Sequence, residues 1–424
     1  MGKLRAQALS ALAAIALTGC TATVSGVAVT PPDLTDSHGV VVELLEIGNY
    51  KARPSPTLGA AGPGGGQFEG IRMAAYVAGP WQVDETLRRQ NDFNIWATMP
   101  FPDPESVGFA MYPGVTELKA RIAASITEHG FIAGFSTARS VLGSDGVAKT
   151  LTNMVLRFPD ADAAAAAAHE MAAIGASAAG APERPVAIDH HPEAIASIHY
   201  DDGDAKVESF APHGPYMLYQ YAFTAKADDQ DPSGRALQLI AKTLDLQVPL
   251  IDRFVPTDPS KLAALPKDPT GLMSRVLSGD GDQEPGRAMG VWGPDTWLHF
   301  AFDPIETAHL LDMAGVDRVA QRLTTIYQAR DTAGATLVAD QISAGMTKFP
   351  SVKPIPGVPG FPIARCFNRT KGFATNEGGP SVQRLYPRYT CVARVDRYAF
   401  TSFSNHEVDA KQQLSAQYLI LAGK

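Results

Sequence analysis

Prolines divide this 424-residue chain into two parts. Five of them, at positions 249, 256, 259, 266 and 269, lie within the segment 255–271 or just before it. Proline has no backbone N–H to donate, so helix interiors and central strands do not tolerate such a run. We therefore expect a surface linker at 255–271 between two domains, 38–254 and 272–424, since one hydrophobic core seldom serves so long a chain.

The first domain begins with three segments of different character. "GVVVELLEIGNY" (39–50) is rich in β-branched residues and predicts a strand. The glycine-rich stretch 58–70 lacks the GK[ST] ending of a phosphate-binding loop and is interpreted as an ordinary loop. Helices are expected at 70–79 and at 114–130, where apolar residues recur at helical spacing.

The rest of the first domain predicts an α+β layer. A strand at 150–159 leads into an alanine-rich helix at 160–175, for which Asp160 is the expected N-cap. Short strands follow at 194–200, 206–212 and 216–223, and the helix "GRALQLIAKTLDL" closes the domain before Pro249. Consecutive strands favour antiparallel pairing, with the helices packed against one face of the sheet.

A similar order of elements returns in the second domain. The segment 286–300 resembles 70–84, and 315–330 has the pattern of the helix at 114–129. The remaining segments predict a strand at 335–340, strands within 389–404 and a last helix at 409–422. This repetition favours a mainly antiparallel α+β unit that was duplicated, and two unrelated α+β domains are the alternative.

The amino terminus has the features of an export signal. Lys3 and Arg5 precede the apolar run 8–19, which is too short to span a membrane but matches a signal-peptide core. Small residues then lead straight into Cys20, an arrangement that resembles the bacterial lipobox. The resemblance implies removal of residues 1–19, a diacylglycerol on the Cys20 thiol and a further acyl chain such as palmitate. A buried core cysteine is the alternative.

Two or three acyl chains would hold the protein stably at the membrane. Residues 20–37 are small, polar and proline-bearing, which predicts a flexible tether. After residue 19 no apolar stretch of about 20 residues remains, so the lipid is the expected membrane contact. The sequence therefore predicts a cell-membrane protein, anchored by lipid on the extracytoplasmic side.

Charge argues against nucleic acid as a partner. Removing Lys3 and Arg5 with the signal changes the formal charge from −8 to −10, and the remaining cations are scattered. Phosphate binding needs clustered cations.

Two further cysteines, Cys366 and Cys391, lie 25 positions apart in the last part of the chain. In an oxidising exterior such a pair predicts a disulfide, which on the chain-entropy model contributes about 3 kcal/mol. Neither cysteine has the neighbouring Cys or His ligands of a zinc site, or an adjacent His that would activate a nucleophile.

Chemistry-bearing motifs are sparse. The chain has no G-x-S-x-G, no H-E-x-x-H and no complete dinucleotide fingerprint, so no catalytic residue or cofactor is predicted. One segment, 187–204, is dense in metal-binding residue types: His190, His191, His199, Asp201, Asp202 and Asp204. On a strand His190 and His191 would point to opposite faces, so we expect an acidic turn rather than a metal site. The acidic segment 278–284 lacks EF-hand spacing and predicts a solvated turn.

Several features together resemble an uncharacterised family of actinobacterial cell-envelope lipoproteins from mycobacteria and nocardiae. They are the lipobox, "LLEIGNY", "RMAAYVAGPWQVD", "GPYMLYQY" and the late cysteine pair. The resemblance covers nearly the whole mature chain. It implies an envelope location and a two-domain layout, and it brings no catalytic residues.

Three classes of function remain. The favoured one is non-enzymatic binding of a lipid, a glycan or an envelope protein through a groove between the lobes. The alternatives are a structural or assembly partner of envelope proteins, and a hydrolase of envelope polymers whose site is assembled from distant residues. A mainly apolar pocket with few polar groups would favour the first class.

Overall fold

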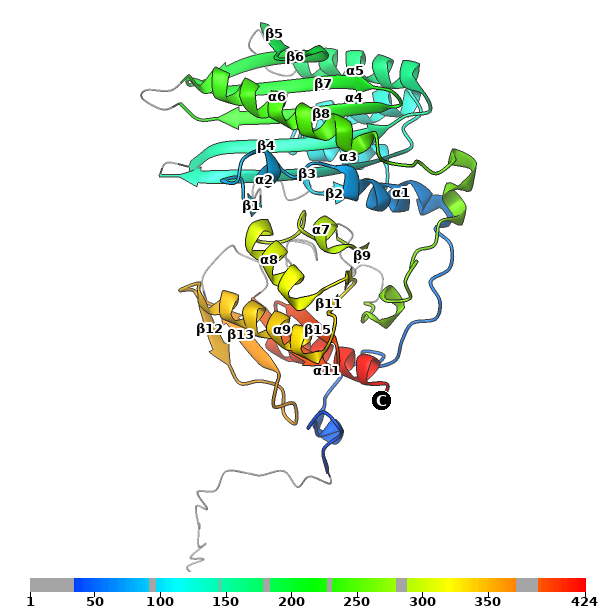
Figure 1. The fold of residues 1–424 in the computed structure, drawn as a ribbon, viewed down its shortest axis with the longest axis vertical. Helices are drawn as coiled ribbons and strands as arrows, with labels where there is room; N and C mark the ends of the chain where they lie inside the picture. The colour runs from blue at the N-terminus through cyan, green and yellow to red at the C-terminus, as the bar shows by residue number, and fades with distance from the viewer. Residues whose placement is uncertain are drawn as a thin grey trace, which may run out of the picture.

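The computed structural model describes residues 34–90, 97–144, 146–177, 184–226, 231–279, 288–370 and 388–424. Two lobes are stacked along the long axis of the molecule (Figure 1). Each lobe contains one antiparallel sheet with packed helices. The predicted α+β class is confirmed.

The sheet of the first lobe has eight strands. Seven of them follow the order β1-β3-β4-β8-β7-β6-β5, and β2 pairs with β3 beside this path. Their bounds are β1 Arg89–Gln90, β2 Met99–Pro100, β3 Ala133–Gly143, β4 Gly146–Arg157, β5 Arg184–Ile188, β6 His191–Asp201, β7 Asp204–His213 and β8 Tyr216–Thr224.

Helices cover both faces of this sheet, which corrects the expectation of a single covered face. Central strands carry apolar side chains on both sides: Val207 and Leu218 share one core with α6, whereas Phe210 and Tyr219 share another with α5. One face holds α1 (Gly65–Met73), α2 (Pro80–Val83) and α6 (Pro232–Ile251). The other holds α3 (Pro104–Met111), α4 (Thr116–Glu128) and α5 (Ala161–Ala176).

The second lobe has a seven-stranded sheet in the order β12-β13-β14-β15-β11-β10-β9. Its strands are β9 Gly290–Trp292, β10 Arg318–Gln321, β11 Thr325–Gln328, β12 Val352–Ile355, β13 Arg365–Arg369, β14 Tyr389–Val395 and β15 Tyr398–Ser404. Its helices are α7 Pro294–Trp297, α8 Pro304–Ala314, α9 Thr332–Thr347 and α11 Glu407–Ala422. The helix α9 packs on β14 and β15 from one face, and α11 packs on them from the other.

The two sheets share one topology. Both lobes contain a helix, a hairpin, a helix, four strands and a last helix in this order: α3, β3–β4, α5, β5–β8, α6 in the first lobe and α8, β10–β11, α9, β12–β15, α11 in the second. The first lobe has the additional helix α4 between α3 and β3. In both lobes the hairpin pairs with the last of the four strands, so the strand orders coincide. Asp103 and Asp303 cap the first helix of each unit before a proline, and Asp160 and Asp331 cap the second. These shared features support a duplicated unit.

Several segments differ from the sequence-based expectation. The segment 39–50 contains the short 3-10 helix Val42–Leu44 rather than a strand, and α1 begins inside the expected glycine loop. The segment 315–330 forms the β10–β11 hairpin rather than a helix, and 335–340 lies in α9. A short apolar segment can form either a helix or a strand, and pairing with neighbouring strands decides which of the two it forms.

The segments 70–84 and 286–300 are not structural counterparts, because α2 precedes β1 whereas α7 follows β9.

The proline-rich segment 255–271 lies against the first lobe. The carboxylate of Glu69 in α1 is fully buried and accepts hydrogen bonds from the Thr257 backbone N at 2.7 Å and from Arg157 Nη1 at 2.9 Å. The 3-10 helix Pro259–Ala264 packs on α1. A buried carboxylate needs such partners, so the contact fixes the path of the linker.

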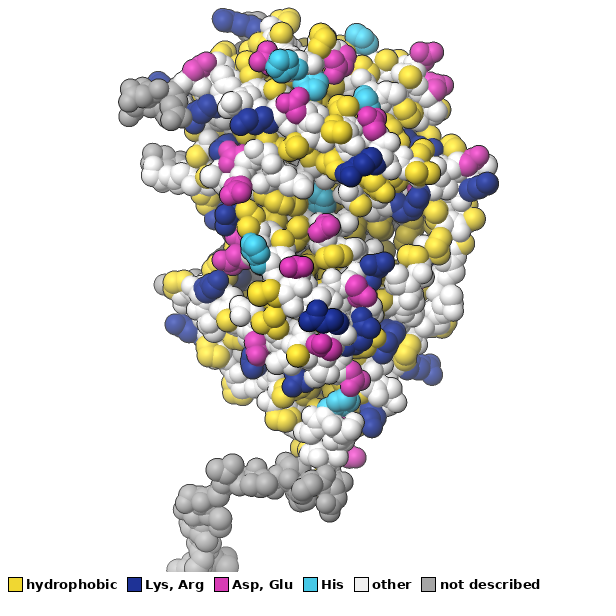
Figure 2. All heavy atoms as spheres, in the orientation of Figure 1, with side chains coloured by type: hydrophobic (Ala, Val, Ile, Leu, Met, Phe, Trp, Pro, Cys, Tyr) yellow, Lys and Arg dark blue, Asp and Glu magenta, His cyan; other side chains and the backbone are white. Residues whose placement is uncertain are grey.

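One hydrophobic core continues from lobe to lobe. Trp292, Trp297 and Leu298 of the second lobe belong to the same buried cluster as Met73 and Phe135 of the first. On the face shown in Figure 2, acidic and basic side chains are interspersed, and the outline narrows between the lobes. In the described part of the chain, no helix combines the length and apolar character needed to cross a bilayer.

Candidate functional site

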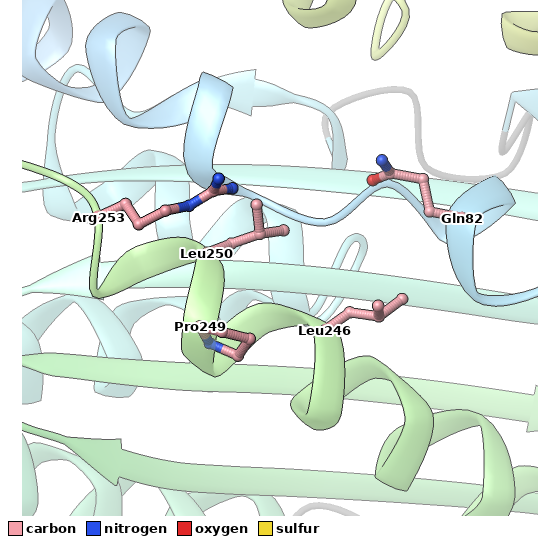
Figure 3. A pocket seen from close by; sticks show the side chains of 5 residues that line it. All are labelled: Gln82, Leu246, Pro249, Leu250 and Arg253. Atoms are coloured by element: carbon pink, nitrogen blue, oxygen red, sulfur yellow. The ribbon is translucent and has the colours of Figure 1, made fainter.

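A groove with a volume of about 400 Å³ lies between α2 and α6 (Figure 3). Its lining residues are Gln82 from α2, Leu246, Pro249 and Leu250 from α6, and Arg253 from the turn directly after α6. Leu246, Pro249 and Leu250 are spaced i, i+3 and i+4, so they form one stripe along the end of α6, and Arg253 follows in the turn after the helix. The volume falls in the range of small-molecule sites.

This stripe is separate from the stripe that folds the protein. The buried face of α6 carries Leu239, Ile240 and Leu244, which pack into the core of the first lobe. Leu246, by contrast, keeps 39% of its surface exposed, and Pro249 is also exposed. Apolar side chains that line a hollow without serving the core are typical of binding surfaces.

Polar groups stand at the two ends of the groove. Gln82 Oε1 accepts a hydrogen bond from the Gly79 backbone N at 2.8 Å, which fixes the orientation of the Gln82 amide. The Arg253 guanidinium lies beside Leu250 at the other end (Figure 3). Within the described residues, no acid forms an ion pair with Arg253.

Two acids flank the stripe, one on α6 and one at its C-cap, and each contacts a histidine of the sheet. Asp245 Oδ1 lies 3.0 Å from His191 Nε2. Asp252 Oδ1 lies 2.6 Å from His213 Nε2. Neither acid lines the groove, whereas Arg253 does.

Buried amides set the distance between the two walls. Gln247 of α6 is fully buried: its Oε1 accepts from the Ala78 backbone N at 2.9 Å, and its Nε2 donates to the Tyr76 carbonyl at 2.8 Å. Asn153 of β4 donates to the same Gln247 oxygen at 2.8 Å. Because a buried amide left unpaired is costly, this network holds the segment before α2 against α6.

The groove wall α2 also reaches the joint between the lobes. Trp81, next to Gln82, lies 5.4 Å from the Arg139 guanidinium carbon and 5.2 Å from the His299 ring. Arg139 of β3 is fully buried and donates to the carbonyls of Leu298, His299 and Ala301, each at 2.8 Å. The Arg139 side chain thus joins the first lobe to the turn after α7.

The joint contains a buried histidine, His299, whose pKa is strongly lowered. Its Nε2 lies 3.1 Å from the Ala74 carbonyl, and its Nδ1 is buried without a hydrogen-bond partner in the described structure. Burial, and then the charge of Arg139, lower the pKa of His299 to about 3. The imidazole is therefore neutral at physiological pH and serves as part of the packed joint.

Of the three cysteines assigned from the sequence, the structure describes two. Cys20 lies outside the described residues. Cys366 and Cys391 are direct partners on β13 and β14 and form a disulfide, with a Cα–Cα distance of 4.1 Å. The acidic segment 278–284 extends outside the described residues from position 280.

The histidine- and aspartate-rich segment 187–204 forms the end of β5, all of β6, the turns at both ends of β6 and the first residue of β7. His190 lies in the β5–β6 turn and Asp202 in the β6–β7 turn, both with positive φ, so the length of β6 separates them. His199 faces Lys206 across the β6–β7 ladder, while Asp201 pairs with Asp204 next to the turn. The described parts of the chain contain no group of three His, Cys, Asp or Glu side chains that could hold a metal ion.

Sequence reasoning missed the groove. The helix expected from the sequence ended before Pro249, so it contained Leu246 but left out Pro249, Leu250 and Arg253. A signal was present, since Leu250 and Arg253 lie beyond the proline and keep helical spacing with Leu246. Proline interrupts a helix interior, but α6 continues only two residues past it.

Fold and site together define a two-lobed α+β protein built from a repeated antiparallel unit, with a surface groove on its first lobe. The chain belongs to the DUF7373 family: the N-terminal domain of unknown function of this family matches residues 57–267, and the C-terminal domain matches residues 252–424. A comparison with curated proteins found no match.

Among solved structures, the chain is similar to the extracellular domain of PknH from Mycobacterium tuberculosis. The two share 14% identity, and the match covers 42% of this chain and 96% of that chain with a TM-score of 0.26. A superposition this loose supports no argument about fold or function.

Proposed function

We propose that the protein is an exported, lipid-anchored protein of the cell envelope that binds a ligand in the groove between α2 and α6 without transforming it. The observation that carries the proposal is the apolar stripe of exposed Leu246 and Pro249 and half-buried Leu250, which lines a hollow of about 400 Å³. The Cys366–Cys391 disulfide supports a location outside the reducing cytoplasm.

The test of ligand binding uses protein purified from its own membrane. Native mass spectrometry, followed by identification of released small molecules, should reveal a bound mass that the Leu246→Asp variant lacks. Leu246 is partly exposed, so this variant should fold, and circular dichroism checks that it does. Equal ligand content in wild type and variant would contradict binding in this groove.

The membrane anchor is tested separately. Cys20→Ala should abolish acylation and leave either unprocessed precursor or released protein, because the thiol that receives the lipid is gone. Membrane fractionation with intact-mass measurement distinguishes these states. A variant that remains in the membrane at the wild-type lipid mass would exclude Cys20 as the anchor.

A second candidate function is that of an assembly partner. Phe302, in the loop before α8, has 63% of its surface exposed and packs edge-on against Phe349 at 5.4 Å. Met313 on α8 has 60% of its surface exposed. Exposed apolar residues of this size favour a protein contact. Phe302→Glu should abolish co-purification of such a partner, whereas Leu246→Asp should not.

A further inference from the structure

The groove between α2 and α6 joins an apolar floor to a cationic end. We infer that its ligand is a single-chain amphiphile with an anionic head group, a fatty-acid-like molecule. The alkyl chain lies along Leu246 and Leu250, and the head group binds Arg253. This inference rests on the proposed function and names the class of ligand.

The floor of the groove fits one alkyl chain. From Leu246 to Leu250 the stripe extends about 6 Å along the helix axis, given a rise of 1.5 Å per residue, and Arg253 follows just beyond the end of α6. The floor between its ends is formed by Leu246, Pro249 and Leu250, and none of these side chains can hydrogen-bond to a ligand. A glycan presents hydroxyl groups along its whole length, which this floor would leave unpaired.

The charged end selects an anion. The Arg253 guanidinium lies beside Leu250 (Figure 3), and a guanidinium binds a carboxylate or phosphate through paired N–H donors. The neighbouring acids Asp245 and Asp252 contact His191 and His213, and in the described part of the chain neither forms an ion pair with Arg253. Charge complementarity therefore favours an anionic head group over a neutral or cationic one.

The opposite end of the groove is neutral. Gln82 offers an amide whose oxygen is already engaged by the Gly79 backbone N. An uncharged amide gives no ionic contact, so the chain end of the amphiphile lies here and the head group lies at Arg253. This orientation makes Arg253 the residue that determines head-group specificity.

Isothermal titration calorimetry tests the inference on the mature chain carrying Cys20→Ser, which keeps every described residue. The probes are octanoate, decanoate and dodecanoate for chain length. Dodecyl phosphate, dodecanol and dodecyltrimethylammonium vary the head group, all below their micelle concentrations. Each buried methylene should raise the affinity about fourfold. The dodecyl anions should bind at least tenfold more tightly than dodecanol, as expected for a charge-assisted contact.

Variants separate the head-group contact from the general charge of the protein. Arg253→Gln should lower the affinity for dodecanoate about tenfold and leave dodecanol binding unchanged. The control Lys242→Gln removes an exposed cation of the same helix outside the groove and should change neither. Dodecanoate and dodecyl phosphate, compared directly, distinguish a carboxylate source from a phosphate source.

Three possible failures have different meanings. If dodecanol binds as tightly as dodecanoate and Arg253→Gln changes nothing, the anionic class is wrong while groove binding stands. If Leu246→Asp leaves the binding of every probe unchanged, binding in the groove itself is wrong and the proposed function falls with it. If no probe binds while the protein from its own membrane carries a ligand that Leu246→Asp removes, only the amphiphile class is overturned.

Discussion

Replacing Arg139 by methionine tests how the two lobes are held together. Methionine retains an unbranched, apolar side chain but removes the guanidinium, so the carbonyls of Leu298, His299 and Ala301 lose their donor. A buried polar group left unsatisfied costs about 1–3 kcal/mol. Local relaxation and water entry offset part of the summed cost of the three carbonyls, so we expect the free energy of unfolding to fall by about 3–5 kcal/mol.

This loss corresponds to a measurable change in melting temperature. Unfolding entropy of about 2.1 cal/mol/K per residue over about 400 residues gives roughly 0.8 kcal/mol/K, so the Tm should fall by about 4–6 °C. Differential scanning calorimetry measures it. The control Arg121→Met removes an exposed arginine with one hydrogen bond to Ser177 and should shift the Tm by less than about 1 °C. An Arg139→Met variant with the same Tm as Arg121→Met would refute the reasoning.

Three further predictions concern acid, the disulfide and the lobes. The pKa of His299 is lowered to about 3 in the folded protein and is about 6.5 when unfolded, so its contribution to stability is complete above pH 6.5 and is lost between pH 6.5 and 3. In urea unfolding at pH 4–7, the free energy of unfolding should fall less with decreasing pH for His299→Gln than for the wild type, and an equal pH dependence would contradict the lowered pKa of His299. Alkylation without reduction should label neither Cys366 nor Cys391, and Cys391→Ser should cost about 3 kcal/mol in chemical unfolding. Fragments 38–254 and 272–424 should each unfold cooperatively but below the Tm of the whole chain, because they share a core, and non-cooperative unfolding of both would show one intertwined unit.

Some of the fold was predictable because its causes lie within a few residues. Asp160 begins α5 by accepting a hydrogen bond from the Ala163 backbone N at 2.9 Å, and the residues of this cap are adjacent in sequence. The strands β6, β7 and β8 were predicted for the same reason, since their composition and the turns between them are local properties. The cysteine pair was predictable by elimination, because once Cys20 is assigned to the anchor only two cysteines remain.

The candidate site required the tertiary structure. The groove combines Gln82 with α6 residues more than 160 positions later, and Arg139 binds carbonyls 159–162 positions away. The segment 315–330 forms a hairpin because β9 and β15 lie on either side of it, and no pattern within the segment encodes those neighbours. By itself, the sequence determined the short-range elements and the cysteine pair. Sheet order, the shared core and the groove were decided by contacts between distant segments, because their energies depend on which surfaces folding brings together.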